Sequence, residues 1–322
     1  MFCSDYVKWL MTALATLANL ANAQTAPLAN GEVVACEALD CPHTAPARND
    51  SAYDCHAAGL DFRGLGVASY TSDLVDSPPT WTVGVSAISL PNQTNVYNFT
   101  RTFFIGTDAE DIDDGIEGCA LFFLAEDDNG NPNPIRPEPP DSWEGSQCAQ
   151  PNGLGDNCVP ELERLASEAA LIDGATCSTI AAALDDGSLD GCFMGQSIVV
   201  HSVPLTGSEA PAPINTAQNA SSNCWPTLPK SNQLVSVFDF NITLLVSEEA
   251  ISNADRWITP MMSVWWNGAG AADANLLCIQ PQSIIGAYSE KGASAGGGAS
   301  LLPVPLLISV FGLLAVVGSH VL

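Results

Sequence analysis

Alternation of apolar and polar residues with a period of two is the feature that most limits the fold of this chain. In the stretch VYNFTRTFFI, one face of an extended strand carries four large apolar residues: Tyr97, Phe99, Phe103 and Ile105. The stretch QLVSVFDFNITLLV repeats the pattern with Phe238, Phe240, Ile242 and Leu244. In both stretches an asparagine, Asn98 or Asn241, falls on the polar face. One buried and one wet face are typical of strands in antiparallel sheets, so we predict a mainly β fold.

Other segments carry weaker strand patterns. WTVGVSA begins at Trp81 and alternates to Ala87, after which Ile88 and Leu90 change phase. This change predicts a β-bulge. Further strands are expected at 197–203, 261–266 and 275–279. Within one of these, Trp265 and Trp266 are adjacent and must point to opposite faces of the strand, so we expect one of them to be in the core.

Helical spacing is confined to one region of the chain. CVPELERLASEAALI places four apolar residues at roughly helical intervals: Leu162, Leu165, Ala169 and Ile172. CSTIAAALDDG predicts a second short helix. The sequence therefore predicts an antiparallel β-sandwich-like domain with a small disulfide-tethered helical insert at about 158–192.

Both ends of the chain carry patterns that predict processing signals. Residues 1–23 contain Lys8, an apolar run and small residues at Ala21 and Ala23, which is typical of a secretory signal peptide that leaves Gln24 as the first residue. A retained signal anchor is the alternative. Residues 301–322 form an apolar tail without Lys or Arg, preceded by a Gly/Ser/Ala linker at 291–300. This order indicates a GPI-anchor signal whose tail is removed.

The linker also contains GASAG, which fits the nucleophile-elbow pattern G-x-S-x-G. A nucleophile elbow needs a strand before the serine and a helix after it, and the flanking residues predict neither. We therefore interpret the linker as the anchor-attachment region, with Gly292 and Ser294 as the best attachment candidates. Between the signals, 24–290 would be one secreted, glycosylated ectodomain.

Cysteines and sequons fit that setting. Of eleven cysteines, Cys3 leaves with the signal peptide. Ten remain for five disulfides: Cys36, Cys41, Cys55, Cys119, Cys148, Cys158, Cys177, Cys192, Cys224 and Cys278. Short loops favour three of the pairs: Cys36–Cys41, Cys148–Cys158 and Cys177–Cys192. Five N-glycosylation sequons begin at Asn49, Asn92, Asn98, Asn219 and Asn241.

Charge excludes one class of partner. The chain carries 36 acidic and 9 basic residues, a formal net charge of −27. Such a chain has no basic surface for nucleic acid.

Several catalytic and metal patterns are weak. The cluster Cys36, Cys41, His43, Cys55 and His56 suggests zinc, but cysteines in an oxidising compartment favour disulfides. The acidic runs at 108–118 and 126–131 do not fit an EF-hand loop. A glycosidase would need a carboxylate pair, for which four acids near strand ends are candidates: Glu126, Asp127, Glu248 and Glu249. We predict no catalytic residue, no metal and no cofactor.

Tryptophans are better candidates for binding, since an exposed indole can stack on a sugar ring. Trp143 and Trp225 lie in or beside predicted loops and are candidate sugar contacts.

Two segments carry a resemblance. At GCALFF (118–123) and SSNCWPTLPKSN (221–232), the chain resembles a group of uncharacterised GPI-anchored surface proteins of filamentous ascomycete fungi. The resemblance implies a fungal cell-surface setting and assigns no functional residue. The sequence thus favours a non-catalytic GPI-anchored glycoprotein on the plasma membrane or cell wall, acting in wall organisation, adhesion or polysaccharide binding. A carbohydrate-active enzyme is the first alternative, and a surface that binds another protein is the second.

Overall fold

The computed structural model describes ten stretches of the chain, together with four single residues between them. These stretches are 33–34, 55–91, 96–107, 115–126, 132–133, 157–185, 192–193, 197–215, 233–245 and 257–283, and the single residues are 93, 112, 148 and 154.

 At a few strand ends only the backbone is described. All of these residues belong to one compact unit, Met1–Gly286, and the second unit, Ala287–Leu322, lies outside the described residues.

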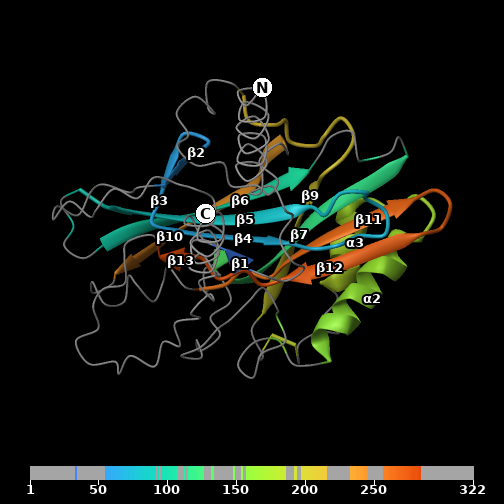
Figure 1. The fold of residues 1–322 in the computed structure, drawn as a ribbon. Coiled ribbons are helices and arrows are strands. Elements are labelled where there is room, and N and C mark those ends of the chain that lie inside the picture. Colours follow the sequence, from blue (N-terminus) through green and yellow to red (C-terminus); the bar gives the residue numbers. More distant parts are fainter. Residues whose placement is uncertain are drawn as a thin grey trace, which may run out of the picture. The chain divides into compact units, whose positions relative to one another are not determined.

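Two antiparallel sheets form the domain (Figure 1). The first sheet has the order β1-β4-β5-β6-β10, with β13 also paired to β4. Its strands are β1 (Val33–Val34), β4 (Gly64–Ser69), β5 (Thr80–Ser89), β6 (Val96–Thr107), β10 (Gln233–Leu245) and β13 (Gln282–Ser283). The second sheet has the order β12-β11-β7-β8, with β9 also paired to β7. Its strands are β7 (Ile116–Glu126), β8 (Pro132–Asn133), β9 (Ile198–Pro204), β11 (Met261–Asn267) and β12 (Ala272–Leu277). A separate hairpin pairs β2 (Cys55–Ala57) with β3 (Leu60–Phe62).

Aromatic side chains fill the space between the two sheets. The ring of Phe122, from the second sheet, packs against Phe103 and Trp81 of the first, with centroid separations of 4.9 and 5.9 Å. All three side chains are fully buried. Burying a large aromatic side chain contributes on the order of 2–3 kcal/mol, so these contacts account for much of the attraction between the sheets. The predicted inward face of β6 is confirmed by this packing.

Polar side chains also lie within this core, and two buried indole N–H groups find acceptors there. The indole Nε1 of Trp81 donates to the hydroxyl of Ser263 across the sheets, at 2.7 Å. The indole Nε1 of Trp265 donates to the hydroxyl of Tyr70, at 2.9 Å. Burial raises the pKa of Tyr70 far above its ordinary range, although its hydrogen bonds to Ser263 and Trp265 act in the opposite direction. The phenol therefore stays neutral.

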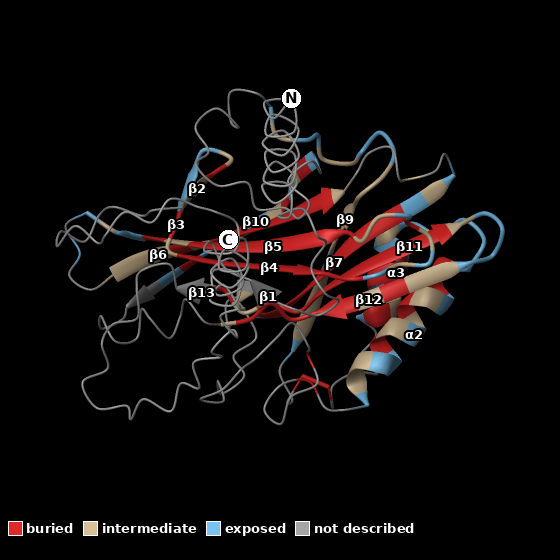
Figure 2. Cartoon of the chain, viewed as in Figure 1, coloured by how far each residue is buried: buried red, intermediate tan, exposed pale blue. Residues whose placement is uncertain are grey.

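The other face of the second sheet is covered by two helices, α2 (Cys158–Ala170) and α3 (Cys177–Leu184). Their inward residues are buried and their outward residues exposed (Figure 2). Leu162 and Ile180 are fully buried in this layer, together with Trp266 from the sheet. Thr176 begins α3 with a capping box, in which its hydroxyl accepts from the backbone N–H of Thr179. The predicted helical insert is confirmed.

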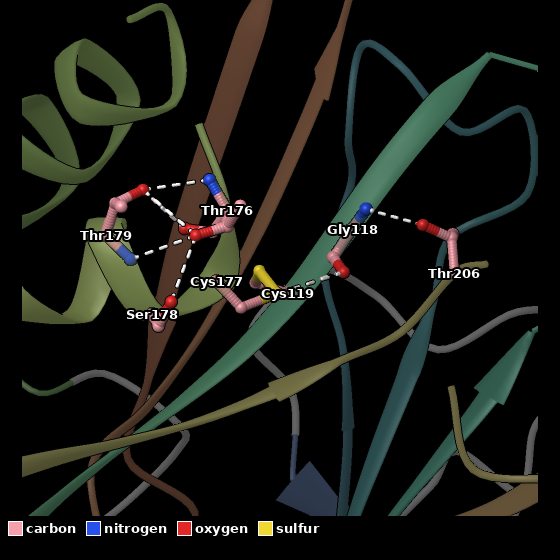
Figure 3. Close-up of a disulfide and its surroundings, with 7 residues drawn as sticks. All are labelled: Gly118, Cys119, Thr176, Cys177, Ser178, Thr179 and Thr206. Carbon is pink, nitrogen blue, oxygen red and sulfur yellow. Dashed lines mark hydrogen bonds between the residues drawn. A yellow bond between two sulfur atoms is a disulfide. The ribbon is translucent and has the colours of Figure 1, made fainter. Parts of the chain in front are cut away.

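Three disulfides lie among the described residues, and one of them ties the helices to the second sheet. Cys119 of β7 bonds Cys177 at the start of α3, as Figure 3 shows. The other two are Cys148–Cys278 and Cys158–Cys192. The expected pairs Cys148–Cys158 and Cys177–Cys192 are therefore wrong. Short separation in sequence favours neighbouring cysteines, whereas the fold brings together cysteines 34 to 130 residues apart. The expected pair Cys36–Cys41 lies outside the described residues.

Two local predictions on the strands need correction. The bulge expected after Ala87 is absent, because β5 pairs with β6 without a register shift through Ser89. Ile88 instead points outward and is 63% exposed. The register shift lies in β10, between Ser236 and Phe238. In β11, adjacent tryptophans do point to opposite faces, but both are buried because each face of the second sheet is covered.

Candidate functional site: two paired sequons

Two of the predicted N-glycosylation sequons lie on neighbouring strands in matching register. β6 carries Asn98-Phe-Thr100 and β10 carries Asn241-Ile-Thr243. The strands are antiparallel, and Asn98 pairs with Thr243 while Thr100 pairs with Asn241. Each asparagine therefore lies opposite the hydroxyl residue of the other sequon. Because side chains alternate along a strand, all four point to the outer face of the first sheet.

The adjoining strand β5 extends this face. Ile88 pairs with Asn98, and Ser86 pairs with Thr100. We call the six residues of these two rows the sequon face: Ser86, Ile88, Asn98, Thr100, Asn241 and Thr243. Asn241, Thr243 and Ile88 are exposed, and the other three are partly exposed. The face thus offers hydroxyl and amide groups to solvent.

The amide of Asn241 is held by the other sequon. The hydroxyl of Thr100 donates to Asn241 Oδ1 at 2.5 Å. Asn98 Nδ2 lies 3.5 Å from the same oxygen. Asn241 Nδ2, the atom that an N-glycan would modify, is not used in either contact. Because both bonds use Oδ1, a glycan on Asn241 Nδ2 would leave them chemically possible.

The β2–β3 hairpin sets the limit of the sequon face. Its Phe62 lies over the outer face of β5, where a Cβ on Gly84 would meet the phenyl ring at 2.3 Å. Phe62 also contacts Phe104 edge-on, with ring centroids 6.0 Å apart. Ser86 Oγ donates to the backbone oxygen of Asp61 at 2.6 Å, which fixes the hairpin at this boundary. Beyond that row, Ile88 and Thr243 are exposed.

The turn of this hairpin has an unusual residue. Ala58 and Gly59 have φ values of 53° and 80°. Positive φ at both positions is typical of a type I′ turn, which matches the twist of the paired strands. Alanine is disfavoured there, since its Cβ crowds the left-handed backbone.

Most of the other predicted site residues lie outside the described residues. These are the sequon asparagines Asn49, Asn92 and Asn219, the tryptophans Trp143 and Trp225, the anchor candidates Gly292 and Ser294, the acids Asp127, Glu248 and Glu249, and Cys36, Cys41, His43 and Cys224. Cys55 is placed in β2 by its backbone alone. Glu126 ends β7 and is exposed.

The described part of the proposed zinc cluster has another arrangement. His56 Nδ1 contacts Asp61 Oδ1 across the β2–β3 hairpin. Among the described residues, no three His, Cys, Asp or Glu side chains gather in a way that would hold a metal ion. No described helix is both long and apolar enough to span a bilayer.

Sequence reasoning missed the pairing of the two sequons. The period-two pattern put Asn98 and Asn241 on polar faces, but nothing in the sequence aligns positions 143 residues apart. The matching Asn-x-Thr spacing was the available signal, because two such triplets can face each other in antiparallel register. Comparison with known proteins adds no family: no protein-family model matches the chain, and no curated protein is significantly similar to it.

Proposed function

We propose that this protein is a non-catalytic, GPI-anchored glycoprotein of the cell surface, whose β-sandwich acts in wall organisation, adhesion or polysaccharide binding. The observation that supports this most directly is the sequon face, where two acceptor asparagines point outward from neighbouring strands. An N-glycan is bulky and hydrophilic and needs an exposed attachment point. The sequon face supplies one exposed asparagine, Asn241, and one partly exposed, Asn98.

The disulfides support the same setting. Cys119–Cys177, Cys148–Cys278 and Cys158–Cys192 join segments far apart in sequence. Disulfides persist in oxidising compartments and are rare in the cytosol. The resemblance to ascomycete surface proteins suggests the fungal cell wall or plasma membrane as the place of action.

Surface attachment is tested on the full chain in a eukaryotic host. We expect cells to display the protein and a phosphatidylinositol-specific phospholipase to release it. Replacing Gly292–Gly296 with bulky residues should abolish display, because the attachment step needs small residues. Unchanged display of that variant would contradict the lipid anchor.

Ligand binding is tested with purified wall glucans, chitin and mannan, measuring bound protein and released sugar together. Binding without release is expected, and Trp143→Ala or Trp225→Ala should weaken it by removing a stacking surface. Sugar release abolished by a single substitution at Glu126, Asp127, Glu248 or Glu249 would instead establish a glycosidase. If the protein neither binds these polysaccharides nor releases sugar from them, a protein partner is favoured.

A further inference from the structure

The two sequons of the sequon face belong to strands that are synthesised at different times. Asn98 and Asn241 are 143 residues apart. At about 5–20 residues per second, β10 follows β6 by roughly 7–29 s. During that interval, one edge of β6 has no strand to pair with, because its neighbours are β5 and β10.

The partner of β6 on its other side is local. β5 ends at Ser89 and β6 begins at Val96, and hairpins form within about 1–10 μs. Until β10 and the strands of the second sheet are made, the β5–β6 hairpin lacks the partners that stabilise it and is at best marginally stable in water. The chain around Asn98 therefore opens repeatedly and stays accessible during the interval. A transferase that acts on the growing chain therefore has seconds in which to modify Asn98.

Asn241 meets a different situation. When β10 is made, β6 is already available, and the two strands pair from Gln233 to Leu245. Pairing fixes the backbone of the sequon in an extended strand. It also engages Asn241 Oδ1 with the hydroxyl of Thr100, at 2.5 Å. In addition, Phe238 and Phe240 of β10 stack on Phe103 of β6. Asn241 therefore bends away from the sheet into an enzyme's active site more rarely than Asn98 in the lone hairpin.

We propose that Asn98 and Asn241 are an ordered pair of glycan acceptors, in which Asn98 is modified first and pairing of β10 with β6 limits the occupancy of Asn241. In each transfer, the asparagine Nδ2 forms a bond to C1 of an oligosaccharide carried on a lipid pyrophosphate. The C1–O bond to the pyrophosphate breaks, the electron pair leaves with that oxygen, and Nδ2 loses one proton. This inference rests on the proposed function, because it requires entry into the secretory pathway.

The first measurement is the occupancy of every sequon in the full chain expressed in a eukaryotic host. Enzymatic release of the glycans in ¹⁸O-labelled water marks each occupied asparagine for mass spectrometry. We expect the glycan occupancy of Asn241 to be at most about half that of Asn98, because Asn98 is available to the transferase for seconds before β10 pairs with β6. Equal occupancy would overturn the proposal. If Asn98 and Asn241 were equally occupied and glycans were also found at Asn49, Asn92 or Asn219, this inference would be wrong but the proposed function would be retained.

A strand-weakening variant tests the cause. The ring of Phe238 docks β10 on the second sheet, stacking on Phe122 at 4.6 Å and on His201 at 4.7 Å. Phe238→Ala slows this docking and leaves both sequons intact. We expect it to raise the occupancy of Asn241 by up to about twofold, without changing that of Asn98, because β6 is modified before β10 arrives. Ile172→Ala, at a 66% exposed position after α2, is the matched control.

Asn98→Gln distinguishes pairing from crowding by the neighbouring glycan. If pairing limits the reaction, Asn241 keeps its low occupancy in this variant. A rise to the level that Asn98 has in the unmodified chain would overturn the proposal. All occupancies are read from total cell protein, so variants that fail to fold still give a result. A chain without a glycan on any sequon would contradict both this inference and the proposed function.

Discussion

The indole Nε1 of Trp265 donates a hydrogen bond to the hydroxyl of Tyr70, 2.9 Å away, in the fully buried space between the two sheets. Tyr70 follows β4 of the first sheet, and Trp265 belongs to β11 of the second. The bond therefore joins the sheets directly. Its neighbour, Trp81 to Ser263, joins them a second time.

We expect Ser263→Ala to destabilise the domain by about 1–3 kcal/mol, because Trp81 Nε1 would remain buried without its acceptor. Chemical denaturation measured by tryptophan fluorescence would give the loss. The control is Trp81→Phe with and without Ser263→Ala, since the serine change should cost less once the indole donor is gone. An equal cost in both backgrounds would contradict a role for this bond.

Close packing around Trp265 makes a second position sensitive. A Cβ added to Gly118 would lie 2.4 Å from Cζ3 of the Trp265 ring. Gly118→Ala should therefore cost about 1–3 kcal/mol through overpacking, seen as a lower thermal midpoint. Gly268→Ala is the matched control, since its Cβ would meet no atom within 4 Å. Equal thermal midpoints for the two variants would contradict the prediction, because the core around Trp265 would then accommodate the added methyl group without losing stability.

The hairpin turn offers a stabilising change. Ala58 has a φ of 53°, and asparagine is favoured at the first central position of a type I′ turn. We expect Ala58→Asn to stabilise the domain by about 0.5–1 kcal/mol. The new Asn-Gly-Leu triplet is not a sequon, so glycosylation does not confuse the result. A lower unfolding midpoint would contradict the turn assignment.

Glu163 should make stability depend on pH. Burial raises the pKa of its carboxyl above the ordinary 4.5, and the charge of Asp273 acts in the same direction, while the bond from the Leu276 N–H opposes them. A raised pKa in the folded state means that folding favours the protonated form. The contribution to stability is then complete below the ordinary pKa and is lost as the pH rises through the raised value.

Glu163→Gln should remove that loss, since the amide is neutral at every pH and its oxygen still accepts from Leu276. Unfolding midpoints measured from about pH 4 to pH 8 should therefore fall less with rising pH than those of the unmodified chain. Glu209→Gln, at an exposed position, is the control. Parallel profiles for Glu163→Gln and the unmodified chain would contradict the prediction.

The stability lost on removing a disulfide should increase with the length of the loop that the disulfide closes. Cys158–Cys192 closes a separation of 34 residues and Cys148–Cys278 one of 130. Replacing both cysteines of a pair with alanine should cost about 4 kcal/mol for the first and about 5 kcal/mol for the second. Chemical denaturation of the two double variants would give the free energy of unfolding that each one loses. A larger loss from the shorter loop would indicate that contacts in the folded state, and not loop closure, dominate.

The sequence allowed prediction of those features whose cause is local. Alternation places Phe99 and Phe103 on one strand face, and the spacing of Leu162 and Ala169 indicates a helix, wherever the chain later packs. Disulfide partners could not be predicted this way, because Cys148 meets Cys278 only after both layers have formed. The burial of Trp266 depends in the same way on helices that cover the second sheet.

The sequon face shows the same limit. Each Asn-x-Thr triplet is readable alone, but the contact between Thr100 and Asn241 depends on the register of strands far apart in the chain. The predicted bulge would have turned Ile88 toward the core. It is absent because Ile88 stays in phase with the strand and is exposed. Its exposure beside Asn98 follows from the end of the β2–β3 hairpin, which covers only part of the outer face.

The three disulfides also give the chain a particular covalent connectivity. The spans 119–177, 148–278 and 158–192 overlap, so every peptide bond between Cys119 and Cys278 is bridged by at least one of them. A protease that cuts once anywhere in this region leaves a single molecule, which separates into two fragments only after reduction. A nicked domain would therefore keep its parts together.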